Sequence, residues 1–396
     1  MIGEEIVYLN RFLDIVDLLS KKSFFLFGPR STGKTSLIEH QLGDHAFIID
    51  LLRSDVLTTL MSAPWSIEGM INKRKSEKTI VVIDEIQKFP PLLNEVHRLI
   101  ESQKIRFLLT GSSARKLRKA DVNLLGGRAW EAELFPLVKN EIPDFSLERY
   151  LQIGGLPHIY LSDEPEEELA AYASIYMNQE ILAEALVRKT QPFAKFLRMA
   201  AFMSGKLLNF TEVGSDAGVS PATIRAYYQI LEDTLLGKIV EPWTKTVKRK
   251  AISTGKFYFF DVGVRNHIAQ IRSLSNGTDG FGQAFEHFIY QEIRAYLSYT
   301  RNKAPLTFWQ AKHGQEVDFL IGDMLAIEVK SSQSITSKHL QGLKVLQEEK
   351  ICQKYILVSL DRVSRIEESI DIVGYEEFLK DLWQGEYDKF MVLAGA

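Results

Sequence analysis

The chain has 396 residues, of which 45% are hydrophobic and 25% are charged, and its formal net charge is −3 at pH 7. This length predicts about two to three domains, and this composition excludes a largely disordered or low-complexity chain. A net charge so near zero excludes a general electrostatic attraction to nucleic acid, so any such contact needs a local basic patch.

The cysteine content and the N-terminus bear on the cellular compartment. The single cysteine, Cys352, excludes an intrachain disulfide and a cysteine zinc site, and it fits a reducing cytoplasm. Glu4 and Glu5 precede any apolar run, so the basic start and long apolar core of a signal peptide are missing. No apolar stretch reaches the roughly 18 residues of a membrane span. We therefore expect a soluble cytoplasmic protein without membrane contact.

Short apolar runs alternate with helix-like segments from Lys22 to about Pro143. This alternation is typical of a parallel sheet with crossover helices, so we predict an α/β domain over residues 1–145. The runs expected to form buried strands are Ser23–Phe27, Ala46–Ile49, Thr79–Ile83 and Arg106–Thr110, with Trp130–Leu134 as a candidate fifth.

Two different patterns follow this domain. Between about Ser146 and Met203 the composition shifts to helix formers, which predicts a helical connector over residues 146–207. Asn209–Asp261 shows two short helical patterns and then two strand patterns separated by basic residues. That order predicts a winged helix-turn-helix over residues 208–272.

The last part of the chain predicts a second α/β domain over residues 273–396. It starts with the loop-like segment Ser273–Gly282. The expected elements are a helix over 282–298, strands near 306–310, 316–321 and 324–330, a helix over 337–349 and a strand over 354–359.

A glycine-rich motif links the first apolar run to the helical pattern Ser36–Gln41. Its sequence, Gly28-Pro29-Arg30-Ser31-Thr32-Gly33-Lys34-Thr35, has the G-x-x-x-x-G-K-[ST] spacing of a P-loop between a strand and a helix. In such a loop, backbone N–H groups face the phosphates at a helix N-terminus. Lys34 would reach the β- and γ-oxygens, and the Thr35 hydroxyl would bind Mg²⁺. We therefore predict that residues from Gly28 to Ser36 bind a nucleoside triphosphate, with ATP and Mg²⁺ as the cofactors.

The apolar run Thr79–Ile83 ends in two carboxylates, Asp84 and Glu85, which is a Walker B pattern. Asp84 would complete the Mg²⁺ shell, and Glu85 would act as the general base that polarises the attacking water. The run Leu108–Ser113 ends in hydroxyl groups, so Thr110 or Ser112 would contact the γ-phosphate or the water. These residues predict hydrolysis in addition to binding.

Three arginines, Arg115, Arg118 and Arg128, follow these strands. One of them would supply charge to the transition state, in cis or across a subunit interface of a homo-oligomer. We select Arg128 because the adjacent Gly126 and Gly127 permit close backbone approach.

The second helix of the winged-helix pattern has a capping signal, Ser220-Pro221. Its apolar face is expected to carry Ile224, Tyr228, Leu231 and Leu235, and its outward face to carry Thr223, Arg225, Tyr227 and Gln229.

Basic residues cluster in the presumed wing: Lys245, Lys248, Arg249, Lys250 and Lys256. Together they would bind the phosphates of double-stranded DNA. Winged helices also dock proteins or serve as structural modules, and both alternatives stay open.

In the last unit Asp318 is followed by the segment Glu328-Val329-Lys330, which is the order of the PD-(D/E)xK nuclease pattern. On adjacent strands Asp318 and Glu328 could share a Mg²⁺ that activates water, with Lys330 orienting the nucleophile. Glu286, on the preceding helix, would reach the same ion. The alternative is that these carboxylates only pair with Lys330 and Lys312.

With these parts in order, the chain resembles a large prokaryotic family of AAA-type ATPases whose P-loop domain is joined to a C-terminal domain of unknown function, itself a winged helix plus a nuclease-like unit. The resemblance covers nearly the whole chain. It rests on Gly28–Thr35, Ile83–Gln87, Leu109–Ser113, Gly126–Arg128, Gly154–Pro157, Phe257–Gly263, Glu316–Asp318 and Glu328–Lys330. It implies an AAA+-like fold for the N-terminal domain, with ATP bound and hydrolysed at the P-loop and Walker B positions. It assigns no chemistry to Gly154–Pro157 or to Asp261-Val262-Gly263, for which tight turns or helix packing suffice.

We therefore predict an ATP-hydrolysing switch in which the nucleotide state repositions the winged helix and the nuclease-like unit on DNA. One alternative is an ATP-gated, Mg²⁺-dependent DNA endonuclease. Another is a non-catalytic, nucleotide-dependent adaptor that binds protein.

Overall fold

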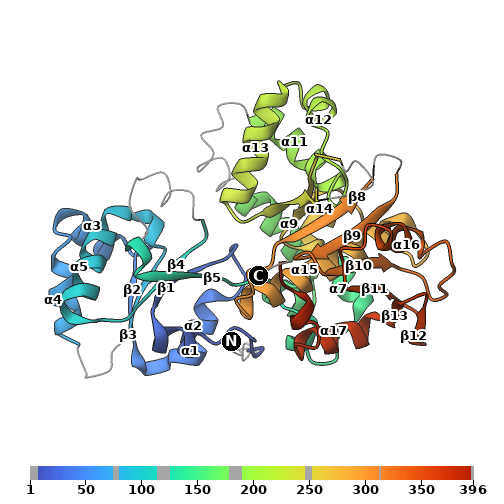
Figure 1. The fold of residues 1–396 in the computed structure, drawn as a ribbon. Coiled ribbons are helices and arrows are strands. Elements are labelled where there is room, and N and C mark those ends of the chain that lie inside the picture. Colours follow the sequence, from blue (N-terminus) through green and yellow to red (C-terminus); the bar gives the residue numbers. More distant parts are fainter. Residues whose placement is uncertain are drawn as a thin grey trace.

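The computed structural model describes residues 8–74, 80–113, 125–177, 190–245, 252–311 and 314–393. Two α/β units lie side by side, the N-terminal one at the left of Figure 1 and the C-terminal one at the right. A helical group from residues 190–233 lies at the top of the picture. None of the helices in the described ranges has the length and apolar content that crossing a membrane requires.

A five-stranded, fully parallel sheet with the order β2-β3-β4-β1-β5 forms the N-terminal unit. Its strands are β1 (Ser23–Phe27), β2 (Ala46–Asp50), β3 (Ile80–Asp84), β4 (Phe107–Gly111) and β5 (Ala129–Glu133). The five predicted strands are thereby confirmed, apart from Thr79, which lies outside the described residues. Because the strands are parallel, the segments that follow β1, β3 and β4 meet at one edge of the sheet.

Helices cover both faces of this sheet. One face packs against α1 (Ile15–Lys21) and α2 (Lys34–Leu42), and the other against α3 (Ser54–Ser62), α4 (Ser66–Asn72) and α5 (Leu93–Gln103). In β1, Phe24 and Leu26 face the first layer, and Phe25 and Phe27 face the second. A strand buried on both faces is apolar throughout, which is why Ser23–Phe27 reads as one continuous apolar run.

Short helices connect the two units. They are α7 (Leu147–Ile153), α8 (Pro157–Leu161), α9 (Pro165–Ala171), the π-helical η6 (Tyr172–Met177) and α11 (Thr190–Phe202). The Ser146 side chain caps α7 by accepting from the backbone N–H of Arg149, and a proline opens α8 and α9. The helical character predicted for this segment is confirmed in its described part. The single-turn 3₁₀ helices are η1 (Gly43–His45), η2 (Ile86–Lys88), η3 (Pro90–Leu92), η4 (Leu125–Gly127), η5 (Lys139–Glu141) and η7 (Asp388–Phe390).

The helices and strands predicted for the winged helix occur in the expected order. They are α12 (Phe210–Ala217), α13 (Pro221–Asp233), β6 (Gly237–Pro242) and β7 (Lys256–Phe259), and the two strands pair antiparallel. Ser220 caps α13 by accepting from the N–H of Thr223, as its position predicts. Lys248, Arg249 and Lys250 of the presumed wing lie outside the described residues.

The prediction for the faces of α13 is wrong at two positions. Tyr227, expected to face outward, is buried, and its ring lies edge-on to that of Phe193, with 4.9 Å between centroids. Leu235 lies beyond the end of α13 with φ 61°, and it packs against the core of the N-terminal unit. Tyr227 is buried because the ring of Phe193 covers its side of α13, and Leu235 differs because the helix ends at Asp233.

An eight-stranded sheet with the order β12-β13-β11-β10-β9-β8-β6-β7 forms the C-terminal unit. Its further strands are β8 (Leu306–Gln310), β9 (Glu316–Ile321), β10 (Leu325–Lys330), β11 (Lys354–Ser359), β12 (Arg365–Glu367) and β13 (Ile370–Gly374). Strand β6 pairs in parallel with β8 at Glu241 and Thr307. The sheet therefore crosses the limit predicted between residues 272 and 273, so the β6–β7 hairpin is continuous with the last unit.

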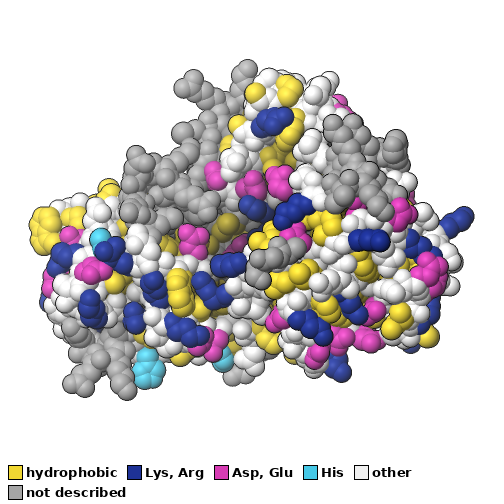
Figure 2. Space-filling model, in the orientation of Figure 1, with side chains coloured by type: hydrophobic (Ala, Val, Ile, Leu, Met, Phe, Trp, Pro, Cys, Tyr) yellow, Lys and Arg dark blue, Asp and Glu magenta, His cyan; other side chains and the backbone are white. Residues whose placement is uncertain are grey.

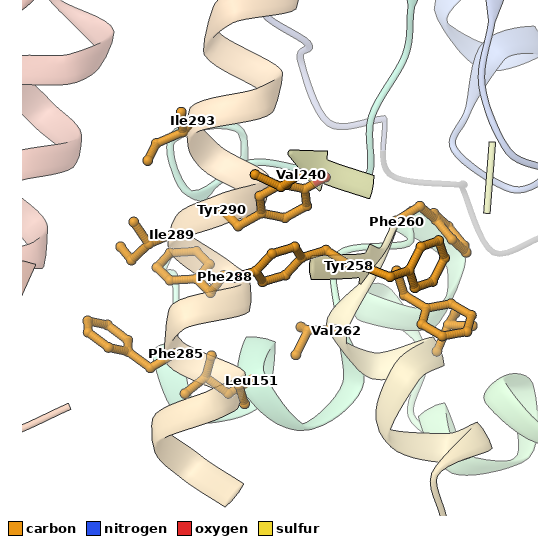
Figure 3. Close-up of a cluster of buried hydrophobic side chains, with 14 of the residues drawn as sticks. Leu151, Val240, Tyr258, Phe260, Val262, Phe285, Phe288, Ile289, Tyr290 and Ile293 are labelled. Carbon is orange, nitrogen blue, oxygen red and sulfur yellow. The ribbon is translucent and has the colours of Figure 1, made fainter. Parts of the chain in front are cut away.

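Helix α15 (Asp279–Tyr299) is the centre of the largest apolar cluster, part of which Figure 3 shows. Tyr290 of α15 stacks on Tyr258 of β7, with 4.2 Å between ring centroids. Helices α14 (Val262–Ile268) and α17 (Tyr375–Trp383) contribute to the same cluster, while α16 (Gln341–Gln347) packs on the opposite face of the sheet.

Two motifs without assigned chemistry, Gly154–Pro157 and Asp261-Val262-Gly263, contact each other in this core. The Asp261 carboxylate accepts from the N–H of Gly155 at 2.8 Å and of Val264 at 2.9 Å. A Cβ at Gly154 would lie 2.1 Å from Asp261 Oδ1, so only glycine fits there. Burial raises the pKa of Asp261 to about 6. Close packing of α7 against α14 thus accounts for both motifs.

Candidate functional site

The predicted P-loop lies between β1 and α2, at the carboxyl edge of the parallel sheet. Gly28 is so close to the segment after β5 that a Cβ would lie 2.6 Å from the carbonyl oxygen of Leu134. Gly33 has φ 92° and precedes α2 without a side-chain hydrogen bond to the helix end. The first N–H groups of α2 therefore lack a side-chain cap, and such groups are suited to bind an anion.

The Lys34 side chain is buried at this loop. Its Nζ donates to the carbonyl oxygens of Gly28 at 2.6 Å and of Pro29 at 3.0 Å. Burial lowers the pKa of Lys34 to about 8, although Glu85 and Asp84 oppose that shift. Neutral carbonyl groups balance a buried ammonium poorly, so the surroundings of Lys34 suit an incoming anion.

The other P-loop residues take different positions. Thr32 is buried, and its hydroxyl donates to the carbonyl oxygen of Pro29 at 2.9 Å. Arg30 is half-buried, while Ser31, Thr35 and Ser36 are exposed on the side from which a nucleotide would approach α2.

The Walker B carboxylates lie beside the end of β4. The Thr110 hydroxyl donates to Asp84 Oδ1 and accepts from the backbone N–H of Glu85 at 3.1 Å. The Ser112 hydroxyl lies 3.4 Å from Glu85 Oε2. Glu85 has φ 58° and ψ 45°, a left-handed conformation that is uncommon for non-glycine residues. The structure therefore brings both candidate sensors, Thr110 and Ser112, to these carboxylates.

Arg128 immediately precedes β5, so it lies at the amino ends of the parallel strands, whereas the P-loop lies at their carboxyl ends. Ala129 is paired with Ser23 at the start of β1, and Gly28 follows the end of that strand. The distance from Ser23 to Gly28 is roughly 16 Å at about 3.3 Å per residue. Arg128 donates to Glu101 on its own edge. Arg128 therefore does not adjoin the P-loop of its own chain in this conformation, and its action across an interface stays a prediction. Arg115 and Arg118 lie outside the described residues.

Two residues with a role at this site were missed from the sequence. Arg11 is buried, and it donates to the Thr32 carbonyl oxygen at 2.7 Å, to that of Phe135 at 2.6 Å and to Glu141 at 2.9 Å. Gln87 donates to both Glu85 and Ser112. Gln87 belongs to the Walker B motif and could have been found there, whereas nothing near Arg11 in the sequence marks it.

A cavity of about 600 Å³ opens beside the P-loop. It lies between the segment before α1, the start of α2 and the connector helix α8. Its lining includes Tyr8, Ser31, Ser36, His40, Pro157 and His158. The rings of Tyr8 and His40 are stacked, with 3.9 Å between centroids. The cavity therefore adjoins the loop that would hold phosphates and offers flat, partly apolar walls.

The four nuclease-like residues lie close together in the C-terminal unit. Glu286 is on α15, Asp318 is on β9, and Glu328 and Lys330 are on β10. Asp318 Oδ2 accepts from the N–H of Val329 at 2.8 Å, so Asp318 and Glu328 lie opposite each other on antiparallel strands. Burial, and then the charge of Asp318, raise the pKa of Glu286 to about 7 and that of Glu328 well above its usual range.

Two lysines form ion pairs with carboxylates of this cluster. Lys330 Nζ lies 2.5 Å from Glu328 Oε1, and Lys256 forms an ion pair with Glu316 and lies 4.0 Å from Glu286. Lys256 was expected to bind phosphate in a wing. It is instead buried, and its Nζ lies beside the carboxylates of Glu316 and Glu286. Burial alone would lower its pKa, but Glu286, Glu316 and Asp318 raise it.

The predicted metal site is not a preformed cluster of ligands in this structure. Within the described ranges, no three His, Cys, Asp or Glu side chains are grouped so that they could hold a metal ion. One oxygen of Glu328 is buried without a hydrogen-bond partner in the described part, but the charge beside it is supplied by Lys330. Pairing of Glu328 with Lys330 is thus observed, while a Mg²⁺ shared by Glu286, Asp318 and Glu328 stays a prediction. Lys312 lies outside the described residues.

Cleavage of plasmid DNA tests whether these carboxylates hold Mg²⁺ or stay paired with lysines. If Lys330 and Lys256 keep them paired, supercoiled plasmid incubated with the protein, Mg²⁺ and ATP should stay supercoiled. Agarose gels of wild type and Asp318→Ala provide the measurement. Nicking by wild type that disappears with Asp318→Ala would contradict this expectation.

Comparisons with known proteins divide the chain into three matched segments. Residues 20–142 match the family described as an AAA domain. Residues 144–275 match a domain of unknown function, DUF8612, and residues 281–378 match another, DUF4143. The match over residues 20–142 shows an AAA-type, P-loop ATPase domain, as predicted, whereas the two other matches carry no function.

The relatives that match most of the chain have low sequence identity to it. The uncharacterized protein Rv2008c of Mycobacterium tuberculosis is 24% identical over 336 residues, which cover 81% of this chain and 74% of that protein. The uncharacterized protein MJ1544 of Methanocaldococcus jannaschii is 23% identical over 358 residues, covering 81% and 76%. Among solved structures, the Walker-type ATPase PABY2304 of Pyrococcus abyssi is similar with a TM-score of 0.44 and 17% identity, over 64% of this chain and 93% of that one.

Proposed function

We propose that this chain, whose residues 20–142 form an AAA domain, binds ATP with Mg²⁺ at the P-loop, hydrolyses it and uses the nucleotide state to shift its C-terminal half. The observation that carries the proposal is the buried Lys34 ammonium. It lies at the uncapped start of α2 and near Asp84 and Glu85, without an anion to balance it among the groups it contacts. Release of phosphate from ATP by the purified protein tests hydrolysis directly.

The roles within the site follow from its geometry. Backbone N–H groups of the loop and Lys34 would hold the phosphates, and the Thr35 hydroxyl and Asp84 would hold the ion. The bound Mg²⁺ would supply charge that offsets the negative oxygens of the phosphates. Glu85 would accept the proton of the attacking water, and Thr110 keeps Asp84 and Glu85 in register through its two hydrogen bonds. The nucleotide-binding residues are Gly28, Pro29, Arg30, Ser31, Thr32, Gly33, Lys34, Thr35 and Ser36.

The adenine ring of ATP would fit the cavity beside Ser31 and Ser36. A purine ring is flat and largely apolar, and the walls formed by Tyr8, His40 and Pro157 have the same character. Since Pro157 and His158 belong to the connector, a nucleotide base in this cavity would contact both the N-terminal unit and the connector.

Contacts between the units support transmission of the nucleotide state. The Ser113 hydroxyl, next to Ser112, donates to the carbonyl oxygen of Asp233 at the end of α13 at 3.4 Å. Leu235 packs on the N-terminal core, and Arg294 of α15 donates to Glu133 at 3.0 Å. Any displacement of the end of β4 would therefore reach α13 directly.

The partner of the C-terminal half is part of the proposal. Arg225 and Gln229 of α13 are exposed and available to double-stranded DNA, but Lys245 is paired with Asp323 and Lys256 is buried. Figure 2 shows Lys and Arg interspersed with Asp and Glu over the described part of the face that it displays. DNA is the partner if the protein binds DNA in a salt-sensitive way and loses this binding when charge is removed at Lys248–Lys250. If no such DNA binding is found, the protein-binding adaptor is favoured.

ATP affinity should fall as the pH rises above about 8. The free site holds Lys34 with a pKa of about 8, and a bound anion raises that pKa, so binding requires the proton. Affinity is therefore fully present below pH 8 and declines by about tenfold per pH unit above it. Calorimetric titration with ATP between pH 6 and about 10 measures the effect.

Lys34→Arg is the matched control, because a guanidinium stays charged over this range. Its ATP affinity, although weaker, should not vary with pH. A wild-type affinity that is constant up to about pH 10 would contradict the assignment of Lys34.

A further inference from the structure

We propose that Gln87 is a positioning residue for ATP hydrolysis: its amide N–H group fixes the Glu85 carboxylate, and its amide oxygen receives a hydrogen of the attacking water. The inference rests on the proposed hydrolysis at the P-loop, and it adds a residue to which the sequence analysis gave no role.

The hydrogen bonds of Gln87 define its relation to Glu85. Gln87 lies in η2, immediately after the left-handed turn at Glu85, and its side chain is buried. Its Nε2 donates to Glu85 Oε2 and to the Ser112 hydroxyl at 3.1 Å. Since the Ser112 hydroxyl also lies 3.4 Å from Glu85 Oε2, the three side chains form a closed triangle. The rotamer of Glu85 is therefore set by Gln87 and by the end of β4.

The other end of the Gln87 amide lacks a partner. Its Oε1 is buried and has no hydrogen bond within the part of the chain that the structure describes. A buried acceptor left unpaired costs roughly 1–3 kcal/mol, and an ordered water commonly satisfies such a group. This acceptor lies on the same side chain that holds the general base, so a water bound to it would lie within reach of Glu85.

Gly111, the last residue of β4, provides the room for this amide. A Cβ built at Gly111 would lie 2.7 Å from Gln87 Oε1, whereas the φ of Gly111 lies outside the left-handed region. An alanine there is therefore compatible with the backbone but would displace the amide of Gln87. Gly111→Ala thus perturbs Gln87 without removing any polar group.

The test is a double-mutant cycle on steady-state ATP hydrolysis. Gln87→Ala and Gly111→Ala are each expected to lower kcat by roughly 10- to 100-fold, with KM changed by less than about twofold, since misplacing a catalytic group affects turnover and not ground-state binding. The double variant should lose no more than the worse single variant, because both act through the same amide. Gly69→Ala is the matched control, since nothing lies within 4 Å of the added Cβ. It should keep the wild-type kcat.

Circular dichroism and ATP affinity show whether each variant folds. If Gln87→Ala does not fold, Gly111→Ala alone tests the role of Gln87. Wild-type kcat in folded Gln87→Ala, or multiplied losses in the double variant, would overturn the role of Gln87. A Glu85→Gln variant that retains the wild-type rate would instead overturn the proposed hydrolysis mechanism itself.

Discussion

Replacing Arg11 by alanine is expected to destabilise the protein by about 3–5 kcal/mol, the range found when one partner of a buried ion pair is removed. The side chains of Arg11 and Glu141 are 3% and 1% exposed, so Glu141 would keep a buried charge without its cation. The loss also removes the hydrogen bonds that tie Thr32 of the P-loop to Phe135. Urea unfolding followed by circular dichroism measures the free energy of unfolding.

The ion pair between Arg53 and Asp55 provides the matched control. Both side chains are largely exposed, at 64% and 67%, so Arg53→Ala should leave the unfolding midpoint unchanged. Adding Glu141→Gln to Arg11→Ala should restore part of the loss, because the unpaired charge disappears. Equal midpoints for Arg11→Ala and Arg53→Ala would show that the buried pair does not hold the P-loop to the segment that follows β5.

Replacing Glu85 by glutamine is expected to lower the rate of phosphate release by roughly 10²- to 10⁴-fold, the range that a general base contributes. Glutamine keeps the size of the side chain and one acceptor oxygen, but its amide cannot take the proton of the attacking water. ATP affinity should stay close to that of wild type, because Lys34 and the loop backbone are unchanged. Calorimetry with ATP therefore separates a loss of chemistry from a loss of binding.

Much of the fold could be predicted because buried strands and capped helices leave local signals. The run Phe24–Phe27 is apolar because both faces of β1 are covered, and Ser220-Pro221 marks the start of α13. The pairing of β6 with β8 left no such signal, since Glu241 and Thr307 are far apart in the sequence. The hairpin was therefore assigned to a separate wing.

The candidate site, like the fold, could be predicted only in part from the sequence. The P-loop and the Walker B carboxylates could be located because their chemistry requires a fixed spacing at the end of a strand. The distance of Arg128 from the P-loop could not be predicted, because adjacent glycines reveal nothing about which edge of the sheet a residue occupies. Lys256 was counted with the other basic residues of the wing, although the hairpin buries it against Glu316. Charge in a sequence does not show whether a side chain faces solvent or a buried carboxylate.

Phosphate release at saturating ATP and Mg²⁺, measured side by side for wild type and Glu85→Gln, tests hydrolysis at the P-loop most directly. The account predicts steady release by wild type and a loss of at least about 100-fold in the variant, with ATP still bound. No release by wild type, or equal release by both proteins, would contradict it.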